Sequence, residues 1–568
     1  MPNRFFRIVF CSLLAGCSAA SNADSASPRS AGNREASADH SSSQAPLPSL
    51  SAGASAVPSA AAPTSGASTP QVSGTSSARA GAGGAAAPSS QPVTPRSEKY
   101  EPVGTNPFVY VAHDPFSTFA ADVDTASYDI FRRNVEHHVA TSAASVRVED
   151  FVNYFEYDYA APAQDAEHPF QLNLAMTENP LGRDTVFLRV GIQAQNPPAA
   201  AKKPANLVFL VDVSGSMLSE DKLPLVQYLL TQTLEVLDSD DTVSIVTYAG
   251  STEVRLAPTS VADKAKIGAV VNGLQAGGGT NGGRGIQLAY EQAERAFLQD
   301  GINHVIMCTD GDFNVGISST DALVKLIEEK RTSGITLTAL GFGIGNLNDA
   351  MMEKVSNAGN GIYSVITSRT QASRYAETRM LSTFIHVAKD MKIQLEWNPS
   401  HVLAYRLIGY ENRAIADNDF RNDIIDAGEV GAGHRVTALY EVVPKDKQLP
   451  KVQGAPAAQD GEATAGDREV GAKDLVVVKV RYKQPGAGET DPAREVVSKV
   501  AASEQPSTFE EADRNLRWTV AIAAFAENLK QSPYAVPGSR ELLREVFVEQ
   551  QERDSERQEL LQLFDQSL

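Results

Sequence analysis

Residues 207–217, LVFLVDVSGSM, decide the fold of the central part of the chain. The first five residues are an unbroken apolar run, which is typical of a strand buried on both faces of a parallel sheet. The run ends at Asp212, and the hydroxyl side chains Ser214 and Ser216 follow at once. A carboxylate and two hydroxyls are hard oxygen donors of the kind that Mg2+ and Mn2+ prefer. The stretch therefore predicts a buried strand that ends in cation ligands.

Apolar runs and helical spacing alternate through residues 204–370. Strands are predicted at about 207–211, 243–246, 252–256, 304–308, 335–340 and 362–366, with amphipathic helices between most of them. This order predicts an α/β domain with a doubly wound, mostly parallel sheet covered on both faces, in which 252–256 is an antiparallel edge strand. Ligands of such sheets bind beyond the carboxyl ends of the strands, so the site is expected at that edge.

Two other segments bring oxygen donors to the same edge. The loop 277–281, GGGTN, places Thr280 and Asn281 before a helix, and the strand 304–308 is followed by Thr309, Asp310, Gly311 and Asp312. These protein oxygens are too few to close the shell of a divalent ion, which leaves positions for water or a ligand.

The pattern resembles the von Willebrand factor A family, whose metal-ion-dependent adhesion site combines a D-x-S-x-S motif with a distant threonine and a distant aspartate. The resemblance implies that one Mg2+ or Mn2+ ion is held by Asp212, Ser214, Ser216, Thr280 and Asp310. In that family the carboxylate of a protein partner often fills the open metal position. Asn281 and Asp312 would support these ligands from outside, although Asp312 also fits a turn. The alternative for the motif is that Asp212 caps a helix and the serines stabilise a turn.

The first 17 residues, MPNRFFRIVFCSLLAGC, have the features of a secretion signal. Arg4 and Arg7 precede a short apolar run that is too short to cross a bilayer. Residues 14–17, LAGC, resemble the lipobox of bacterial lipoproteins, which implies that residues 1–16 are removed and that Cys17 is lipidated. Ser18 after the cysteine favours the outer membrane by the same resemblance. The alternative is an ordinary signal peptide.

The next segment, residues 17–97, consists almost entirely of Ala, Ser, Gly, Pro and Thr after the cysteine. Such a composition cannot bury enough apolar surface to fold, so a disordered tether is predicted. A flexible chain of this length has a root-mean-square reach of about 50 Å.

The charge of the chain narrows the classes of partner. The 568 residues carry a formal net charge of -19. An acidic surface repels phosphate backbones, so nucleic acid is not expected as a partner. Of the three cysteines only Cys308 lies beyond the leader, in an apolar run that predicts a core position.

The flanking segments 98–203 and 371–568 contain alternating strands and several helices. Strands are predicted at about 170–176, 186–192, 393–397, 402–410, 435–443 and 476–482, and helices near 130, at 148–155, over 371–392 and at the carboxyl end. Neither flank alone has enough strands for a stable sheet. We therefore expect the two flanks to form one β-rich α+β domain into which the A-type domain is inserted.

Two acidic segments of the flanks also resemble a family. Residues 122–128, DVDTASY, and 426–434, DAGEVGAGH, are similar to segments of YfbK-like A-domain lipoproteins. Asp122 and Asp124 suggest either a second metal site or helix capping, and capping is favoured because a helix begins there. The acidic stretch 417–429 does not fit an EF-hand loop, because Asn422 stands where glycine is needed.

The motifs of common enzymes are missing from the sequence. It has no G-x-S-x-G elbow, no H-E-x-x-H and no P-loop with its lysine. The expected function is that of a lipid-anchored envelope protein that captures a protein or peptide carboxylate through a bound cation. The alternatives are an envelope scaffold in which the metal only stabilises the fold, and a hydrolase.

Overall fold

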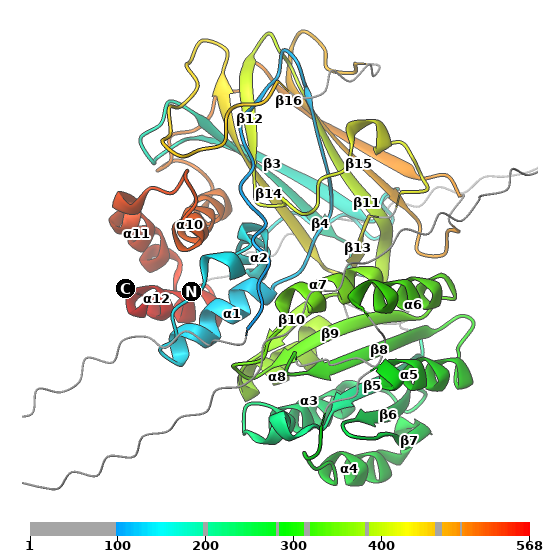
Figure 1. Cartoon of the computed structure of the whole chain (residues 1–568). Coiled ribbons are helices and arrows are strands. Elements are labelled where there is room, and N and C mark those ends of the chain that lie inside the picture. Colours follow the sequence, from blue (N-terminus) through cyan, green and yellow to red (C-terminus); the bar gives the residue numbers. More distant parts are fainter. Residues whose placement is uncertain are drawn as a thin grey trace, which may run out of the picture. The chain divides into compact units, whose positions relative to one another are not determined.

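A six-stranded sheet forms the centre of the inserted domain (Figure 1). The computed structural model describes residues 98–196, 203–279, 283–311, 319–380, 385–425, 427–460, 468–488 and 491–567. The sheet order is β10-β9-β8-β5-β6-β7, with every neighbouring pair parallel except the last. Its strands are β5 (Ala205–Asp212), β6 (Thr242–Tyr248), β7 (Thr252–Ser260), β8 (Ile302–Thr309), β9 (Thr336–Phe342) and β10 (Tyr363–Ile366). The predicted doubly wound sheet with an antiparallel edge strand is therefore confirmed.

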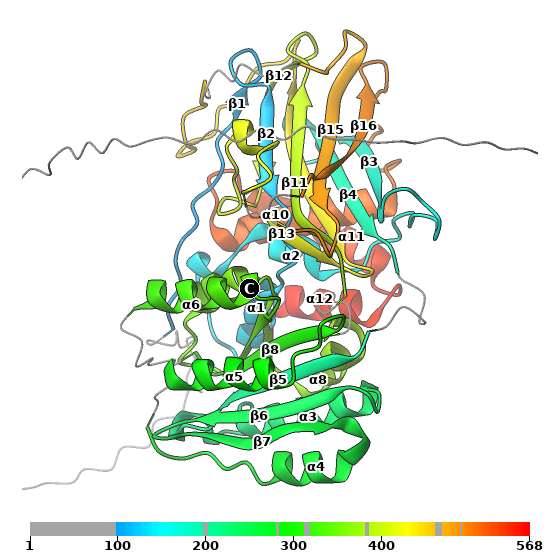
Figure 2. The same ribbon diagram turned by 90° about the vertical axis from the view of Figure 1, so that its right-hand side faces the viewer.

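Helices cover both faces of this sheet. They are α3 (Leu223–Val236), α4 (Lys264–Asn272), α5 (Gly283–Arg295), α6 (Thr320–Thr332), α7 (Asp349–Ala358) and α8 (Arg369–Arg374). Leu207 and Phe209 of β5 pack with α3, α4 and α8, whereas Val208 and Leu210 pack with α5, α6 and α7. Figure 2 shows α5 and α6 on one side of the strands and α3 and α8 on the other. The apolar run of β5 is therefore buried on both faces, as its sequence predicts.

The flanks build two antiparallel five-stranded sheets. The first sheet has the order β1-β12-β14-β4-β3. The second is built around β11, which pairs with β2 and β15 and, through its first half, with β13. The last strand, β16, pairs with β15. The strands are β1 (Val109–Tyr110), β2 (Phe116–Ala120), β3 (Phe170–Glu178), β4 (Val186–Ala194), β11 (His386–Trp397), β12 (Val402–Ile408), β13 (Gly428–Gly431), β14 (Arg435–Pro444), β15 (Asp474–Lys483) and β16 (Arg494–Ala501).

Strands from before and after the A-type domain alternate within each of these sheets. β2 pairs with β11, β1 with β12 and β4 with β14. One apolar core joins the facing sheets, with Val190 and Tyr440 from the first and Ile393, Trp397 and Val478 from the second. The expected insertion of the A-type domain into a single β-rich domain is confirmed.

Helices pack on the other face of the first sheet. They are α1 (Ala126–Glu136), α2 (Val148–Tyr154), α10 (Arg514–Lys530), α11 (Arg540–Gln550) and α12 (Ser555–Gln566). Phe151, Trp518 and Phe547 from three of these helices share an apolar cluster with Phe187 of β4 and Leu439 of β14. Among the described residues, no helix is both long enough and apolar enough to cross a membrane.

Two predictions for the flanks are wrong. Residues 371–392 were expected to be helical throughout, but β11 begins at His386. The local residues favour a helix, and the pairing of this segment with β13 and β15 overrides that preference. Neither Asp122 nor Asp124 caps α1. Instead, the backbone amide of Ser127 in its first turn donates to Asp150 Oδ2 of α2 at 2.9 Å.

Candidate metal centre

Asp212 is the last residue of β5, and its side chain is fully buried. Its Oδ1 accepts a hydrogen bond from the backbone amide of Ser214 at 2.8 Å, and its Oδ2 accepts one from the Thr309 hydroxyl at 3.3 Å. The turn that follows β5 and the end of neighbouring β8 thus fix the carboxylate. These hydrogen bonds are compatible with metal binding, because each carboxylate oxygen has a second lone pair.

The two serine hydroxyls of the motif lie together at the end of the same strand. Ser214 Oγ and Ser216 Oγ are 3.0 Å apart, with Ser214 buried and Ser216 half-buried. The amide of Gly215 donates to the carbonyl of Gly278 at 3.0 Å, and a Cβ on Gly215 would come within 3.3 Å of that oxygen. This contact ties the motif to the loop that leads to Thr280.

Asp310 follows β8, the strand beside β5, and is also buried. Asn346 Nδ2 donates to its Oδ2 at 3.3 Å. The next residue, Gly311, has a φ of 95°, and a Cβ there would lie 2.5 Å from the amide of Asn348. Only glycine fits this turn, which sets the direction of the Asp310 side chain.

A lysine that the sequence analysis did not single out contacts this site. Lys222 Nζ lies 2.8 Å from Asp310 Oδ2, and the lysine side chain is only 8% exposed. Its stem packs over Gly343, where a Cβ would lie 2.5 Å from the lysine Cγ. Nothing in the local sequence distinguishes Lys222 from other lysines before helices, because its partner lies 88 residues away.

The charges at the site favour a bound cation. Burial raises the pKa of Asp212 to about 6, hydrogen bonds from Ser214 oppose the rise, and the nearby charge of Asp310 adds to it. A desolvated carboxylate beside a second carboxylate gains from a positive ion. Carboxylates and hydroxyls also match the ligand preference of Mg2+ and Mn2+. The described residues therefore fit the expected ion.

The structure does not describe every predicted ligand. It brings Asp212, Ser214 and Ser216 together and places Asp310 on the adjacent strand end. Thr280, Asn281 and Asp312 lie outside the described residues, as do Cys17 and the tether. The complete ligand set stays a prediction.

A cleft lies next to the motif at the same edge of the sheet. It is lined by residues of the β5, β6 and β7 ends and of the 273–278 loop, among them Val213, Ser251 and Gly277. Leu218, two residues after Ser216, has 69% of its surface exposed. The edge thus offers an apolar side chain and a hollow surface beside the proposed ion.

Three family models match successive parts of the chain. One described as von Willebrand factor matches residues 94–189, the von Willebrand factor type A domain matches 206–377, and one described as uncharacterized protein YfbK, C-terminal, matches 382–568. YfbK of Escherichia coli K12 is 36% identical over 448 residues, which cover 78% of this chain and 75% of that protein. The chain belongs to the YfbK family.

Other similarities of this YfbK-family chain are confined to shorter regions. Protein sll0103 of Synechocystis is 26% identical over 33% of this chain and 43% of its own length. The bovine inter-alpha-trypsin inhibitor heavy chain H4 is 29% identical over 29% of this chain, but this match spans only 19% of that protein.

Two solved structures are similar to parts of this chain. A von Willebrand factor type A protein from Catenulispora acidiphila is 18% identical, with a TM-score of 0.38 over 64% of this chain and 80% of that one. A mussel byssus matrix protein, described with a zinc-occupied MIDAS motif, is 20% identical, with a TM-score of 0.26 over 31% of this chain and 44% of that one.

Proposed function

We propose that this YfbK-family chain is a lipid-anchored cell-envelope protein that captures a protein partner through a divalent cation in its A-type domain. The observation that supports the proposal is the convergence of Asp212, Ser214 and Ser216 at the carboxyl end of β5, beside Asp310. These residues and Thr280 would hold Mg2+ or Mn2+. The ion would supply an open coordination position for a carboxylate of the partner.

The partner would be a protein or peptide and not nucleic acid. The net charge of -19 disfavours phosphate backbones, while a bound divalent ion creates a local attraction for an acidic side chain. Lys222 adds a positive charge at the same place. The exposed Leu218 would contribute apolar contact next to the metal-bound carboxylate.

The membrane anchor would be the lipid on Cys17. The Cys17→Ser variant tests this part of the proposal. The wild-type chain should be labelled by a radioactive fatty acid and recovered with the membranes. The Cys17→Ser chain should be neither labelled nor membrane-bound. Recovery of an unlabelled wild-type chain would favour the ordinary signal peptide and remove the lipid anchor from the proposal.

The capture role is tested with the full chain as bait in envelope extracts. The bait is used in Mg2+, in EDTA and as the Asp212→Ala variant, with Leu218→Asp as a variant that leaves the metal ligands intact. We expect a protein that is retained only by the wild-type bait in Mg2+, and more weakly by Leu218→Asp. Equal recovery in all conditions would contradict metal-bridged capture.

The outcome of Asp212→Ala separates capture from a scaffold role. Lost capture by a folded variant supports a metal that binds a partner, whereas global unfolding of the variant supports a metal that only stabilises the fold. We also propose that the chain is not an enzyme. Hydrolysis of a captured partner that depends on Ser214 or Ser216 would overturn that part of the proposal.

A further inference from the structure

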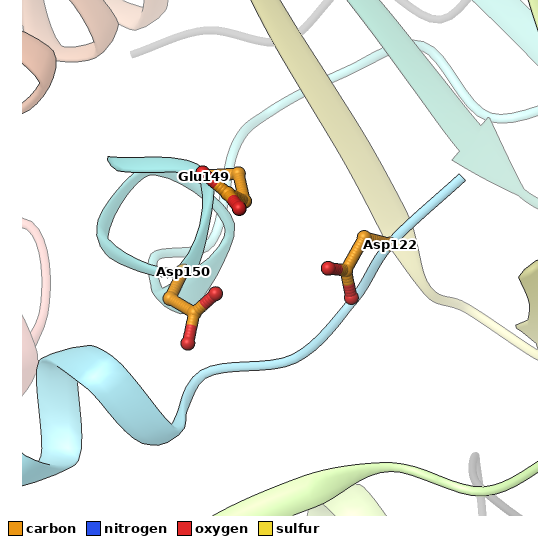
Figure 3. A group of neighbouring side chains, drawn as sticks. All are labelled: Asp122, Glu149 and Asp150. Atoms are coloured by element: carbon orange, nitrogen blue, oxygen red, sulfur yellow. The ribbon is translucent and has the colours of Figure 1, made fainter. Parts of the chain in front are cut away.

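A second group of carboxylates lies between the A-type domain and the β-rich domain. Asp122 stands in the segment between β2 and α1, and Glu149 and Asp150 are adjacent residues in the first turn of α2. One oxygen from each lies within 4.8 Å of the others, and the three residues are 7%, 1% and 0% exposed. Figure 3 shows the Asp122 side chain pointing from its extended segment toward the two side chains of α2.

Protein groups donate hydrogen bonds to only some of these carboxylate oxygens. Asp150 Oδ2 accepts from the Ser127 amide and from Arg147, and the two oxygens of Asp122 accept from the Asp124 amide at 2.9 Å and from Arg413 Nε at 2.7 Å. Asp150 Oδ1 and both oxygens of Glu149 are buried without a hydrogen bond of normal geometry. Leaving such atoms without a hydrogen bond is unfavourable, and more so when they are charged.

Glycine allows the Glu149 carboxylate to occupy this position. Gly409 has a φ of 81°, and a Cβ there would lie 2.6 Å from Glu149 Oε2. The backbone thus leaves a space just large enough for the buried Glu149 carboxylate.

The surrounding charges do not balance. Arg147 contacts Asp150, Asp349 and Glu353, Arg413 contacts Asp122, Asp124 and Glu353, and Lys530 contacts Glu411. With Glu149, seven carboxylates in this network face three cations. Buried charge of one sign is unfavourable unless protons or a cation neutralise it.

The pKa values show the same imbalance. Burial, and then the charge of Glu411, raises the pKa of Glu149 to about 7. Burial raises the pKa of Asp150 to about 8, although Arg147 opposes the rise and Glu149 adds to it. Both shifts have the direction expected where buried negative charges outnumber positive ones.

We propose that Asp122, Glu149 and Asp150 bind a second divalent cation, Ca2+, which is distinct from the ion at Asp212. Ca2+ accepts six to eight oxygens at about 2.3–2.6 Å in flexible geometry, so two ligands across the ion are up to about 5 Å apart. The separation of the three carboxylates fits this span. Water would complete the shell, and a cleft lined by Asp122, Asp124 and Arg413 gives the ion a path inward.

Such an ion would hold the A-type domain and the β-rich domain in a fixed relative position. Asp122 and α2 belong to the β-rich domain, and residues next to them in sequence contact the A-type domain. Arg147 Nη1 lies 2.8 Å from Asp349 Oδ2 at the start of α7, and Asp124 Oδ1 accepts from the amide of Tyr363 in β10 at 2.8 Å. Ca2+ would set the position of α2 and the Asp122 segment, and through them the orientation of the two domains.

The test counts Ca2+ ions bound to the full chain by equilibrium dialysis. An Asp212→Ala background removes the first site, and Glu149→Gln is then added as a change that keeps shape but removes charge. We expect one Ca2+ per chain in Asp212→Ala and none after Glu149→Gln. Saturating Ca2+ should raise the Tm of the background by about 3 °C, the size expected for a chain of this length at hundredfold excess over Kd, and leave the Tm of the Glu149→Gln chain unchanged.

The alternative is that Glu149 and Asp150 share protons instead of an ion. In that case the Asp212→Ala chain binds no Ca2+ and its Tm does not change when Ca2+ is added, and the proposal is overturned. If Glu149→Gln does not fold, Asp122→Asn takes its place. Undiminished Ca2+ binding by a folded Asp122→Asn or Glu149→Gln chain would also overturn the assignment.

Discussion

At the scale of single residues, Lys222 places its ammonium group 2.8 Å from Asp310 Oδ2, beside the proposed ion. Replacement by methionine keeps the buried stem and removes the charge. We expect Lys222→Met to bind Mg2+ about tenfold more tightly, because a unit charge a few ångströms from a divalent ion costs about 1–2 kcal/mol even at high dielectric. Isothermal titration calorimetry measures the change.

Lys264→Met is the matched control, because Lys264 is an exposed lysine of the same domain, 3.7 Å from Glu235. Its effect on Mg2+ affinity should be small, since solvent screens exposed charges. Weaker Mg2+ binding by Lys222→Met would contradict the prediction and would mean that the lysine orients Asp310 for the ion.

His304 of β8 gives the folded chain a defined sensitivity to acid. Burial, with a smaller contribution from His386, lowers the pKa of His304 from 6.5 to about 3, and its Nδ1 lies 2.5 Å from Thr336 Oγ1. The unfolded chain binds this proton near pH 6.5 and the folded chain only near pH 3. The contribution of His304 to the free energy of unfolding is therefore fully present above pH 6.5 and is lost as the pH falls toward 3.

From pH 7 to pH 4.5 this histidine should remove about 2–3 kcal/mol from the free energy of unfolding. Urea unfolding of the wild-type and His304→Leu chains at both pH values measures how much of the loss is due to His304. The variant is expected to be less stable at pH 7 but to lose less on acidification. An equal loss in both chains would show that His304 does not control the acid response.

The sequence indicates the strand-end residues of the candidate site more readily than their neighbours. Asp212, Ser214 and Asp310 were found because polar residues that end apolar runs meet at one edge of a parallel sheet. Lys222 and Glu149 could not be found in this way. Their partners are distant in sequence, and a lysine or glutamate near a helix start is ordinarily a solvated residue.

At the scale of elements, a buried arginine joins α10 to the first sheet of the β-rich domain. Arg406 of β12 contacts Glu441 of β14 at 3.0 Å and Glu527 of α10 at 2.8 Å, with the three side chains 2%, 0% and 8% exposed. Arg406→Met should lower the free energy of unfolding by about 3–5 kcal/mol, because buried Glu527 loses its arginine and buried Glu441 keeps only Arg183, 3.5 Å away. Denaturant unfolding measures the loss.

The exposed pair Arg255 and Glu253, 3.1 Å apart within β7, is the matched control. Arg255→Met should cost less than about 1 kcal/mol. Equal costs for the two arginines would contradict a structural role for the buried network.

The first half of strand β11 is an element that its local sequence does not predict. The segment 386–392, HVAKDMK, has no strict alternation and contains several good helix formers, yet it continues the strand that begins at His386. Its pairing with β13 starts at His386 and that with β15 at Lys389, through irregular register. The alternating strands β3 and β4 were predictable because their own side chains show which face is buried.

At the scale of the whole molecule, the two flanks depend on each other. β11 would lose its partner β2, and β12 and β14 would lose β1 and β4, if the first flank were absent. We expect residues 375–568 alone to show no cooperative unfolding, because the unpaired strands and the apolar core between the sheets would be exposed.

Addition of residues 98–203 should restore folding by complementation. Circular dichroism during thermal unfolding follows both preparations. Cooperative unfolding of residues 375–568 by themselves would contradict the mutual dependence of the flanks. The sequence allows the insertion to be predicted, because neither flank has enough strands, but alternation shows buried faces and not which distant strand pairs with which.

Diffraction from crystals of the full chain grown with Mn2+ tests whether the end of β5 holds a divalent cation. Mn2+ gives an anomalous signal and prefers the same oxygen ligands as Mg2+. We predict an anomalous peak coordinated by Asp212, Ser214 and Ser216. An ordered strand end without such a peak at saturating Mn2+ would contradict the claim.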